Sequence, residues 1–345
     1  MDPEPAAPWT KGKLTGSESS PLVSVVTPFY NTRLYLSQCI ESVRSQSYDH
    51  WEHILVDNVS SDGSTEIAEE YAAAEKRVRL VRNSAFLTQA ENYNSALRQI
   101  SPDSRYCKIV EADNWIFPHC LEEMVRVAEN HPGVGIVEAY HLAGAQIRLA
   151  WLTPEITFLS GRDACRFQLL HHPDQSIFGP PTSHLFRSDL VLGRDPFYDA
   201  DSVLEDYEVL FELLKSNDFG FVHQVLSYVR MDNTNESITH SISDFGPYLL
   251  HALIALRRYG PFYLDEHEYE RRLKAISSRY FRLLGRGFLR RRSSPFWEYH
   301  KSGLKTIGIE LTPLRLSKYA LLAAAGLVLE PKRVIRRLFR KKKVP

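Results

Sequence analysis

The feature that most constrains the fold is a regular alternation of two patterns over the first 140 residues. Short apolar, β-branched runs occupy 22–27, 51–57, 77–81, 106–110 and 133–138, and helical spacing of apolar residues occupies 34–43, 64–74, 88–100 and 118–130. Strands separated by helices of this length are typical of βαβ units, whose strands lie parallel. The sequence therefore predicts an α/β fold with a mostly parallel central sheet flanked by helices.

The pattern changes in the second half of the chain. A strand over 182–186, a helix over 203–216 and a strand over 219–229 are expected there, and 245–345 reads as helical and basic. Residues 1–20 are rich in Pro, Ser, Gly and Glu, a composition typical of a disordered tail. We expect a main domain over 21–240, with halves 21–140 and 141–240, and a helical basic module over 241–345.

Charge is distributed unevenly along the chain. The 345 residues have a formal net charge of zero, yet residues 251–345 hold 23 Lys and Arg against 7 Asp and Glu. Such an asymmetry favours an anionic partner for the C-terminal part, with a solvated basic face as the alternative. The four cysteines are widely spaced and form no Cys-x-x-Cys pair, which fits a reducing compartment. No basic stretch precedes an apolar run at the N-terminus, so we expect no secretory signal and a cytoplasmic protein.

Polar side chains follow the predicted strands. They are Thr27, Tyr30 and Asn31 after the first strand, Asp57, Asn58 and Asp62 after the second, Asn83 after the third, and Glu111, Asp113 and Asn114 after the fourth. In open parallel sheets, ligands bind outside the carboxyl ends of the strands. Strand-end loops are also polar because they meet water, but several acids and amides at one end of a sheet favour a ligand site.

The segment Glu111-Ala112-Asp113 carries the chemistry most directly. Carboxylates at positions i and i+2 of an extended chain point to the same side. Together they can share a hard cation such as Mg²⁺ or Mn²⁺, which prefers oxygen ligands and leaves positions open for phosphates. Taken alone, this spacing is weak evidence for a cation site, and a solvated loop explains it more often.

In combination, these segments resemble the family 2 glycosyltransferases of the GT-A fold over about residues 21–240. The segments that carry the resemblance are 23–31 (V-S-V-V-T-P-F-Y-N), 54–64 (I-L-V-D-N-V-S-S-D-G-S), Asn83, Ala90, Asn92 and 111–114 (E-A-D-N). The resemblance implies a nucleotide-sugar site bordered by Thr27, Pro28, Tyr30, Asn31, Asp57, Asp62, Asn83, Asn92, Glu111 and Ala112, with Asp57 on the base. It also implies Asp113 as the principal ligand of Mn²⁺ or Mg²⁺, with Glu111 nearer the ribose. The family usually has Asp at the position of Glu111 and often a further Asp at that of Asn114.

The second half of the resemblance concerns the acceptor side. Glu205-Asp206 is similar to the family's Glu-Asp pair at the start of a helix, which implies Asp206 as the general base. The alternative is that both acids only complement the dipole of that helix. Arg230 would neutralise the leaving diphosphate, and Asp232 stands where the family often has a metal-binding His.

The resemblance thus implies a metal-dependent, inverting glycosyltransferase. It would move a sugar from a nucleoside-diphosphate sugar, with a UDP-sugar expected, to a glycan or lipid-linked acceptor in glycan or polysaccharide synthesis. A sugar nucleotidyltransferase is the runner-up, but that class needs a glycine-rich phosphate loop, and residues 27–33 read T-P-F-Y-N-T-R. A non-catalytic nucleotide-sugar-binding protein is the third class, against which Asp57, Asp113 and Asp206 together speak.

The C-terminal segment 319–345 favours a membrane surface. Residues 332–343 place Val334, Ile335, Leu338 and Phe339 on one helical stripe and basic residues on the other. Such a helix is typical of segments that lie on an anionic membrane, which would put the protein at the inner face of the membrane. The apolar run over 319–329 is shorter than the roughly 20 residues that span a bilayer. Without a nucleic-acid motif we expect no nucleic-acid partner, and a helix docked on the main domain is the remaining alternative.

Overall fold

A single sheet organises the chain in the computed structural model, which describes residues 20–172, 175–204, 206–231 and 245–329. The strand order is β3-β2-β1-β4-β9-β6-β10-β5, with β7 paired to β6 and β8 to β10. The strands are β1 (Val23–Phe29), β2 (Trp51–Asp57), β3 (Val78–Arg82), β4 (Tyr106–Ile109), β5 (Trp115–Ile116), β6 (Val134–Ala143), β7 (Gln146–Arg148), β8 (Phe158–Leu159), β9 (Leu185–Arg187) and β10 (Asp218–Val229).

The central strands confirm the predicted α/β fold with a mostly parallel sheet. β1 lies parallel to both β2 and β4, β2 to β3, and β6 to β10. β9 is inserted antiparallel between β4 and β6. It begins three residues later than predicted because Pro181–Ser183 forms a 3₁₀ turn. That turn places Thr182 beside the end of β4, where it enters the candidate site described below.

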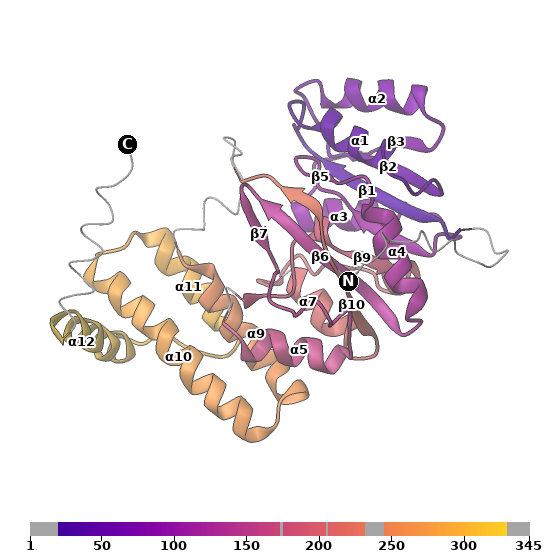
Figure 1. The fold of residues 1–345 in the computed structure, drawn as a ribbon. Helices are drawn as coiled ribbons and strands as arrows, with labels where there is room; N and C mark the ends of the chain where they lie inside the picture. The colour runs from indigo at the N-terminus through magenta and orange to yellow at the C-terminus, as the bar shows by residue number, and fades with distance from the viewer. Residues whose placement is uncertain (1–19, 173–174, 205, 232–244, 330–345) are drawn as a thin grey trace, which may run out of the picture.

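Helices cover both faces of this sheet (Figure 1). Apolar residues of α1 (Leu36–Arg44), α2 (Ser64–Ala74) and α4 (Cys120–Asn130) join one core cluster, and those of α3 (Gln89–Leu97), α5 (Gly161–Leu170) and α7 (Asp206–Leu213) join the other. Strand β1 serves both clusters, because Val25 packs into the first and Val26 into the second. Burial on both faces explains why these strands read as continuous apolar runs.

The predicted C-terminal helices are present and share the main core. They are α9 (Pro247–Tyr263), α10 (Glu266–Leu289), α11 (Ser294–Lys305) and α12 (Pro313–Leu329), which lie together at one end of the molecule (Figure 1). Phe211 of α7 stacks on Tyr259 of α9 with ring centroids 4.7 Å apart. Arg166 of α5 forms a two-pronged ion pair with Glu268 of α10, at 2.7 and 2.6 Å. The domain boundary at residue 240 stays a prediction.

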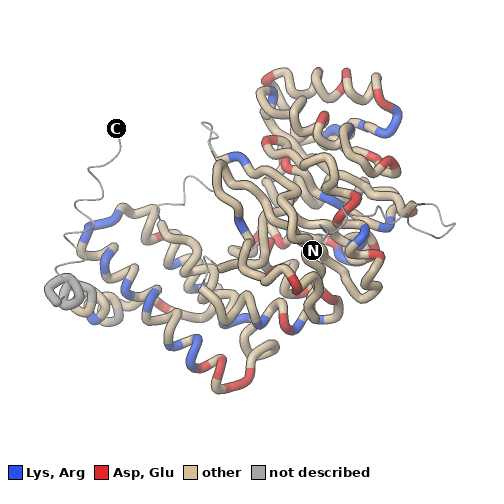
Figure 2. The backbone as a smooth tube through the Cα atoms, in the orientation of Figure 1, with Lys and Arg blue, Asp and Glu red and all other residues tan. Residues whose placement is uncertain are grey.

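Basic residues recur along α10, whose acids are confined to its first turns (Figure 2). Across the described ranges, no helix combines the length and the apolar character needed to cross a bilayer. The tail over 1–19 and the amphipathic segment over 332–343 lie outside the described residues.

Phe211 tests whether the C-terminal helices depend on the sheet. Its ring is 1% exposed and joins the apolar core of the sheet to that of α9. We expect Phe211→Ala to lower the free energy of unfolding by about 3–5 kcal/mol, the usual cost of a large cavity. Because the core is continuous, denaturant unfolding should stay a single transition for both sheet and helices. Two separate transitions, with only one of them shifted, would contradict a shared core.

Candidate active site

The carboxyl ends of β1, β2 and β4 meet at one end of the sheet. The parallel register places Phe29 opposite Asp57, and Val26 opposite Ile109. Loops that leave these strands therefore emerge side by side, as expected for parallel strands. The end of β10 joins them, because Tyr228 pairs with Trp115 directly after the acidic loop, residues 111–114.

Asp57, at the end of β2, is a buried carboxylate. Its side chain is 3% exposed. One oxygen accepts a hydrogen bond from the Ser60 backbone N–H at 2.9 Å and the other from the Thr65 hydroxyl at 2.7 Å. These donors hold the carboxylate in place and leave each oxygen one further lone pair.

The loops after β1 and β2 are joined by hydrogen bonds. Asp62 accepts from the Arg33 backbone N–H at 3.0 Å, and Asn31 accepts from that of Ser61 at 2.8 Å. Burial raises the pKa of Asp62, but hydrogen bonds from Ser64 and Arg33 outweigh it and leave the pKa below its usual value. Asp62 therefore stays ionised and holds the two loops together.

The residues at and just after the end of β1 that carry the family resemblance fall into a buried and an exposed group. Thr27 is fully buried, its hydroxyl lies 2.9 Å from Nε2 of His53, and Pro28 is buried beside it. Tyr30 is 46% exposed and meets Phe86 edge-on, with ring centroids 4.8 Å apart. Tyr30 and Phe86 thus offer apolar surface beside the polar loops, whereas the Thr27 side chain supports the sheet.

A network of side-chain hydrogen bonds links the loops after β2 and β3 to α3. The Asn83 amide donates to Asn58 at 3.1 Å and to Asn92 at 2.9 Å, and the Ser95 hydroxyl donates to Asn83 at 2.8 Å. Asn58 in turn binds both backbone groups of Leu87. The network fixes the loop that presents Phe86 and orients α3 toward the acidic loop.

Glu111 is held by donors from three separate segments. One carboxylate oxygen accepts from the Tyr93 hydroxyl at 3.0 Å. The other accepts from Asn114 at 2.8 Å and from the Thr182 hydroxyl at 3.0 Å. Thr182 also accepts from the Glu111 backbone N–H at 3.0 Å. This arrangement positions the start of the acidic loop.

Charge accumulates at this loop. Burial raises the pKa of Glu111, the Asp113 carboxylate raises it further, and the three side-chain hydrogen bonds oppose the rise. Burial likewise raises the pKa of Tyr93 well above its usual value, to which the carboxylates of Glu111 and Asp206 add. Tyr93 therefore stays a proton donor to Glu111, and Asp206 lies near enough to interact with it. Ala112 is buried between the two acids.

The carboxylate oxygens of the acidic loop are of the ligand type that fits a hard cation. Glu111 and Asp113 supply carboxylates, the ligand type that Mg²⁺ and Mn²⁺ prefer. Over the described part of the chain, no cluster of three or more His, Cys, Asp or Glu side chains is placed to hold a metal. Asp232 lies outside the described residues, as does Glu205.

Arg230 directly follows β10 and contacts the acidic loop. Its Nε donates to the Asp113 carbonyl at 3.0 Å, and another guanidinium nitrogen donates to Gln38 at 2.9 Å. The guanidinium carbon lies 4.3 Å from the ring centre of Tyr35 and 5.3 Å from that of Trp115. A stacked, hydrogen-bonded Arg next to an acidic loop is well placed to meet a phosphate.

Several supporting residues were not predicted from the sequence. Thr182 gives no local signal, since it lies 71 residues from Glu111 in the chain. Tyr93 follows Asn92 directly, and Phe86 follows Asn83 by three residues, so both lie beside motif positions without belonging to them. The predicted roles of the individual site residues stay predictions.

Glu111 should make stability depend on pH. A raised carboxyl pKa favours the protonated folded state, so its contribution is present at acid pH and is lost as pH rises through the folded-state pKa. As pH rises through that pKa, we expect the free energy of unfolding of Glu111→Gln to increase relative to that of wild type. The increase should be about 1.4 kcal/mol for each tenfold difference in the acid dissociation constant of Glu111 between unfolded and folded states. Denaturant unfolding without divalent cations measures this difference in free energy between about pH 4, near the ordinary pKa of a glutamate, and about pH 8. Glu70→Gln, at an exposed position of α2, is the control, and a difference that does not vary with pH would contradict the expectation.

This chain is similar in sequence to known proteins. The model of the family described as Glycosyl transferase family 2 matches residues 24–190. The putative glycosyltransferase EpsE of Bacillus subtilis is 35% identical over 137 residues, which cover 37% of this chain and 49% of that protein. An uncharacterized glycosyltransferase of Haemophilus influenzae is 28% identical over 225 residues, covering 63% and 82%. The chain spans about half or less of the first curated relatives that it matches.

Solved structures agree in fold. S. aureus TarS 1–349 in complex with UDP-GlcNAc superposes with a TM-score of 0.57 at 16% identity, over 87% of this chain and 88% of that one. The mannosyltransferase PcManGT from Pyrobaculum calidifontis, in complex with GDP-Man and Mn²⁺, has a TM-score of 0.51 at 16% identity, over 91% and 88%. Identities this low establish the fold alone. With the family match and the strand-end acids, residues 24–190 are a family 2 glycosyltransferase domain on a GT-A-type fold.

Proposed function

We propose that this protein transfers a sugar from a nucleoside-diphosphate sugar, a UDP-sugar being our expectation, to an acceptor hydroxyl in glycan or polysaccharide synthesis. The observation that carries the proposal is the acidic loop at the sheet end, where Glu111 accepts a hydrogen bond from Tyr93 and the carboxylate of Asp206 interacts electrostatically with that tyrosine. Two structures of similar fold support the donor class, since TarS is bound to UDP-GlcNAc and PcManGT to GDP-Man.

The donor would lie across the carboxyl ends of β1, β2 and β4. Asp57 and the amide network would face the nucleoside, and the exposed rings of Tyr30 and Phe86 would contact the base. Asp113 and Glu111 would hold Mn²⁺ or Mg²⁺, which supplies charge neutralisation for the diphosphate when bound. Arg230 would bind the same diphosphate and stabilise the charge that builds on it as it leaves.

Asp206 would act as the general base. An alcohol becomes a competent nucleophile when its proton is removed in the transition state, and a carboxylate within reach can remove it. The acceptor oxygen then attacks the anomeric carbon from the face opposite the diphosphate, the C–O bond to the diphosphate breaks, and the proton moves to Asp206. One displacement of this kind inverts the anomeric configuration.

Two other functions make different demands on the site. A sugar nucleotidyltransferase needs a glycine-rich phosphate loop, whereas residues 27–36 between β1 and α1 contain no glycine. A non-catalytic binder needs no base, so nothing would favour a carboxylate at Asp206. Release of nucleoside diphosphate from a sugar nucleotide separates the glycosyltransferase from both.

We also propose that segment 319–345 contacts an anionic membrane surface, where a lipid-linked or glycan acceptor would be met. The start of α12 supports this, because Leu314, Leu321 and Leu322 are exposed. Exposed leucines beside basic helices are typical of segments that lie on lipid headgroups. The location would then be the cytoplasmic face of that membrane.

Asp206→Asn tests the base. The amide keeps the shape of the side chain but cannot accept the proton, so we expect donor binding to persist while transfer falls by about a hundredfold to ten-thousandfold. Glu212→Gln, on the same helix and paired with Lys215 at 2.7 Å, is the matched control and should transfer normally. Donor binding is measured by calorimetry and transfer by diphosphate release. Transfer at the wild-type rate in Asp206→Asn would refute the assignment.

Asp113→Ala tests the cation site. Removal of the carboxylate should abolish the part of donor binding that depends on added Mn²⁺ or Mg²⁺, because the acidic loop then keeps only the hydrogen-bonded Glu111. Binding of Mn²⁺ itself, followed by paramagnetic resonance, provides a readout that needs no turnover. Asp201→Ala, at an exposed loop position before α7, is the control. Equal cation-dependent binding in wild type and Asp113→Ala would show that the cation binds elsewhere or not at all.

A further inference from the structure

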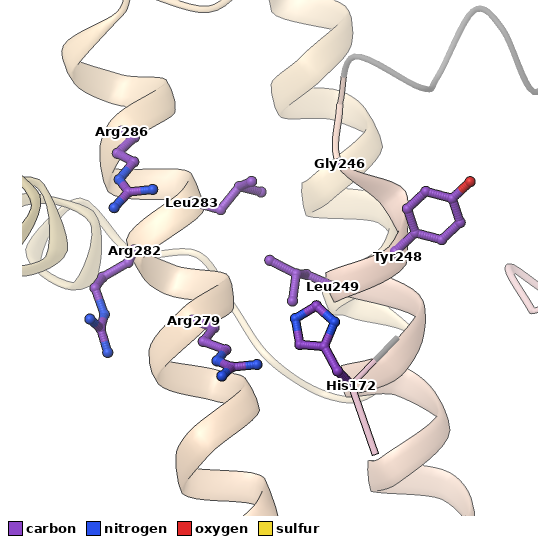
Figure 3. Close-up of a pocket in the computed structure, with 8 residues that line it drawn as sticks. All are labelled: His172, Gly246, Tyr248, Leu249, Arg279, Arg282, Leu283 and Arg286. Atoms are coloured by element: carbon purple, nitrogen blue, oxygen red, sulfur yellow. The ribbon is translucent and has the colours of Figure 1, made fainter. Parts of the chain in front are cut away.

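A pocket lies between α9 and α10, and none of the acidic-loop residues lines it. Its volume is about 340 Å³. The lining residues come from α10, from the start of α9 and from the turn after α5 (Figure 3), and they are His172, Gly246, Tyr248, Leu249, Arg279, Arg282, Leu283 and Arg286. None of these residues belongs to the proposed donor site. We call this cavity the arginine pocket.

The pocket concentrates positive charge. Arg279, Arg282 and Arg286 are spaced by three and four residues, which puts them on one side of α10. No lining residue is acidic. Within the described ranges none of the three forms an ion pair, and Arg282 instead donates to the carbonyl and hydroxyl of Ser278 at 3.2 and 2.8 Å. Among the described residues, these three guanidinium groups therefore have no neutralising carboxylate.

The acidic residues of α10 lie at its N-terminal end, away from the three arginines of the pocket. A long exposed helix commonly pairs its cations with acids one turn away. In α10 the acids Glu266, Glu268 and Glu270 all lie in the first turns, and Glu268 is already paired with Arg166. Like charges that crowd one surface repel each other, and an anion between them would relieve that repulsion.

Apolar groups complete the wall. Figure 3 shows Leu283 and Arg279 pointing from α10 toward α9, with Leu249 and His172 opposite them. Tyr248 is 62% exposed at the rim. A small hydrated ion gains nothing from leucine and tyrosine side chains, whereas a phosphate ester carries an organic group that does. Guanidinium groups bind phosphate oxygens in pairs with charge-assisted hydrogen bonds.

We propose that the arginine pocket binds a phosphate ester, with its phosphate on Arg279 and Arg286 and its organic group on Leu249 and Leu283. The proposal does not depend on the transfer chemistry at the acidic loop. The ester has two sources, a soluble molecule or the headgroup of an anionic phospholipid. Exposed Phe288 and Leu289, directly after the pocket on α10, favour the lipid source.

The test uses the full chain and two probes, soluble glycerol 3-phosphate and vesicles of phosphatidylglycerol, with phosphatidylcholine vesicles as the uncharged reference. The pocket variant combines Arg279→Gln with Arg286→Gln. The matched control combines Arg271→Gln with Lys274→Gln, two exposed positions on the same helix outside the pocket that remove the same charge. Thermal unfolding and donor binding, which should be unchanged in both, show that the variants are folded.

We expect the pocket variant to bind at least one anionic probe about tenfold more weakly than wild type, and the control variant to bind nearly as wild type. Loss with glycerol 3-phosphate supports the pocket with a soluble ester, and loss with phosphatidylglycerol vesicles alone supports a lipid headgroup. Equal weakening in both variants would show a diffuse basic surface and overturn the proposal. Absence of binding to either anionic probe in wild type would overturn it as well.

Discussion

The site depends on the way in which Glu111 is held at the end of β4. Its carboxylate is partly buried, which is costly for a charge unless donors surround it, and Tyr93, Asn114 and Thr182 supply those donors. The donors come from α3, from the acidic loop itself and from the 3₁₀ turn before β9. One carboxylate thereby fixes three segments relative to each other. Asp113 lies two residues further along the same acidic loop.

Buried charge behind the loop strengthens the same framework. Lys108 of β4 is fully buried and donates to the carbonyls of Thr182 and His184 at 2.8 and 3.0 Å. Burial lowers the pKa of Lys108, which is the expected consequence of taking an ammonium group out of water. The same lysine thus anchors the turn whose threonine holds Glu111. A rigid support of this kind would suit the proposed transfer, which depends on positioning the donor and the acceptor relative to each other.

The opposite charges of the chain are separated in space as well as in sequence. The acids of the candidate site, Asp57, Glu111 and Asp113, lie at or after the ends of β2 and β4, and arginines run along α10 among the C-terminal helices (Figure 2). The continuous core through Phe211 and Tyr259 holds both ends in one body. A donor with its cation and a phosphate ester would then bind to different parts of one rigid protein, each matched by local charge.

The sequence alone determined the βαβ alternation, the parallel strands and the acidic loop, because these depend on periodicity and on spacing within short segments. It placed β2 and α2 correctly to the residue, and it located Asp57 and Asp113 at strand ends. Helix α5 was not predicted, and the strand predicted over 182–186 begins only at Leu185 in the three-residue β9. Only the tertiary structure decided that Thr182, Tyr93 and Asn114 meet on Glu111, and that Leu249 and Arg279 face each other across a pocket. Contacts between residues tens of positions apart leave no periodic trace in the chain, because packing rather than local propensity brings them together.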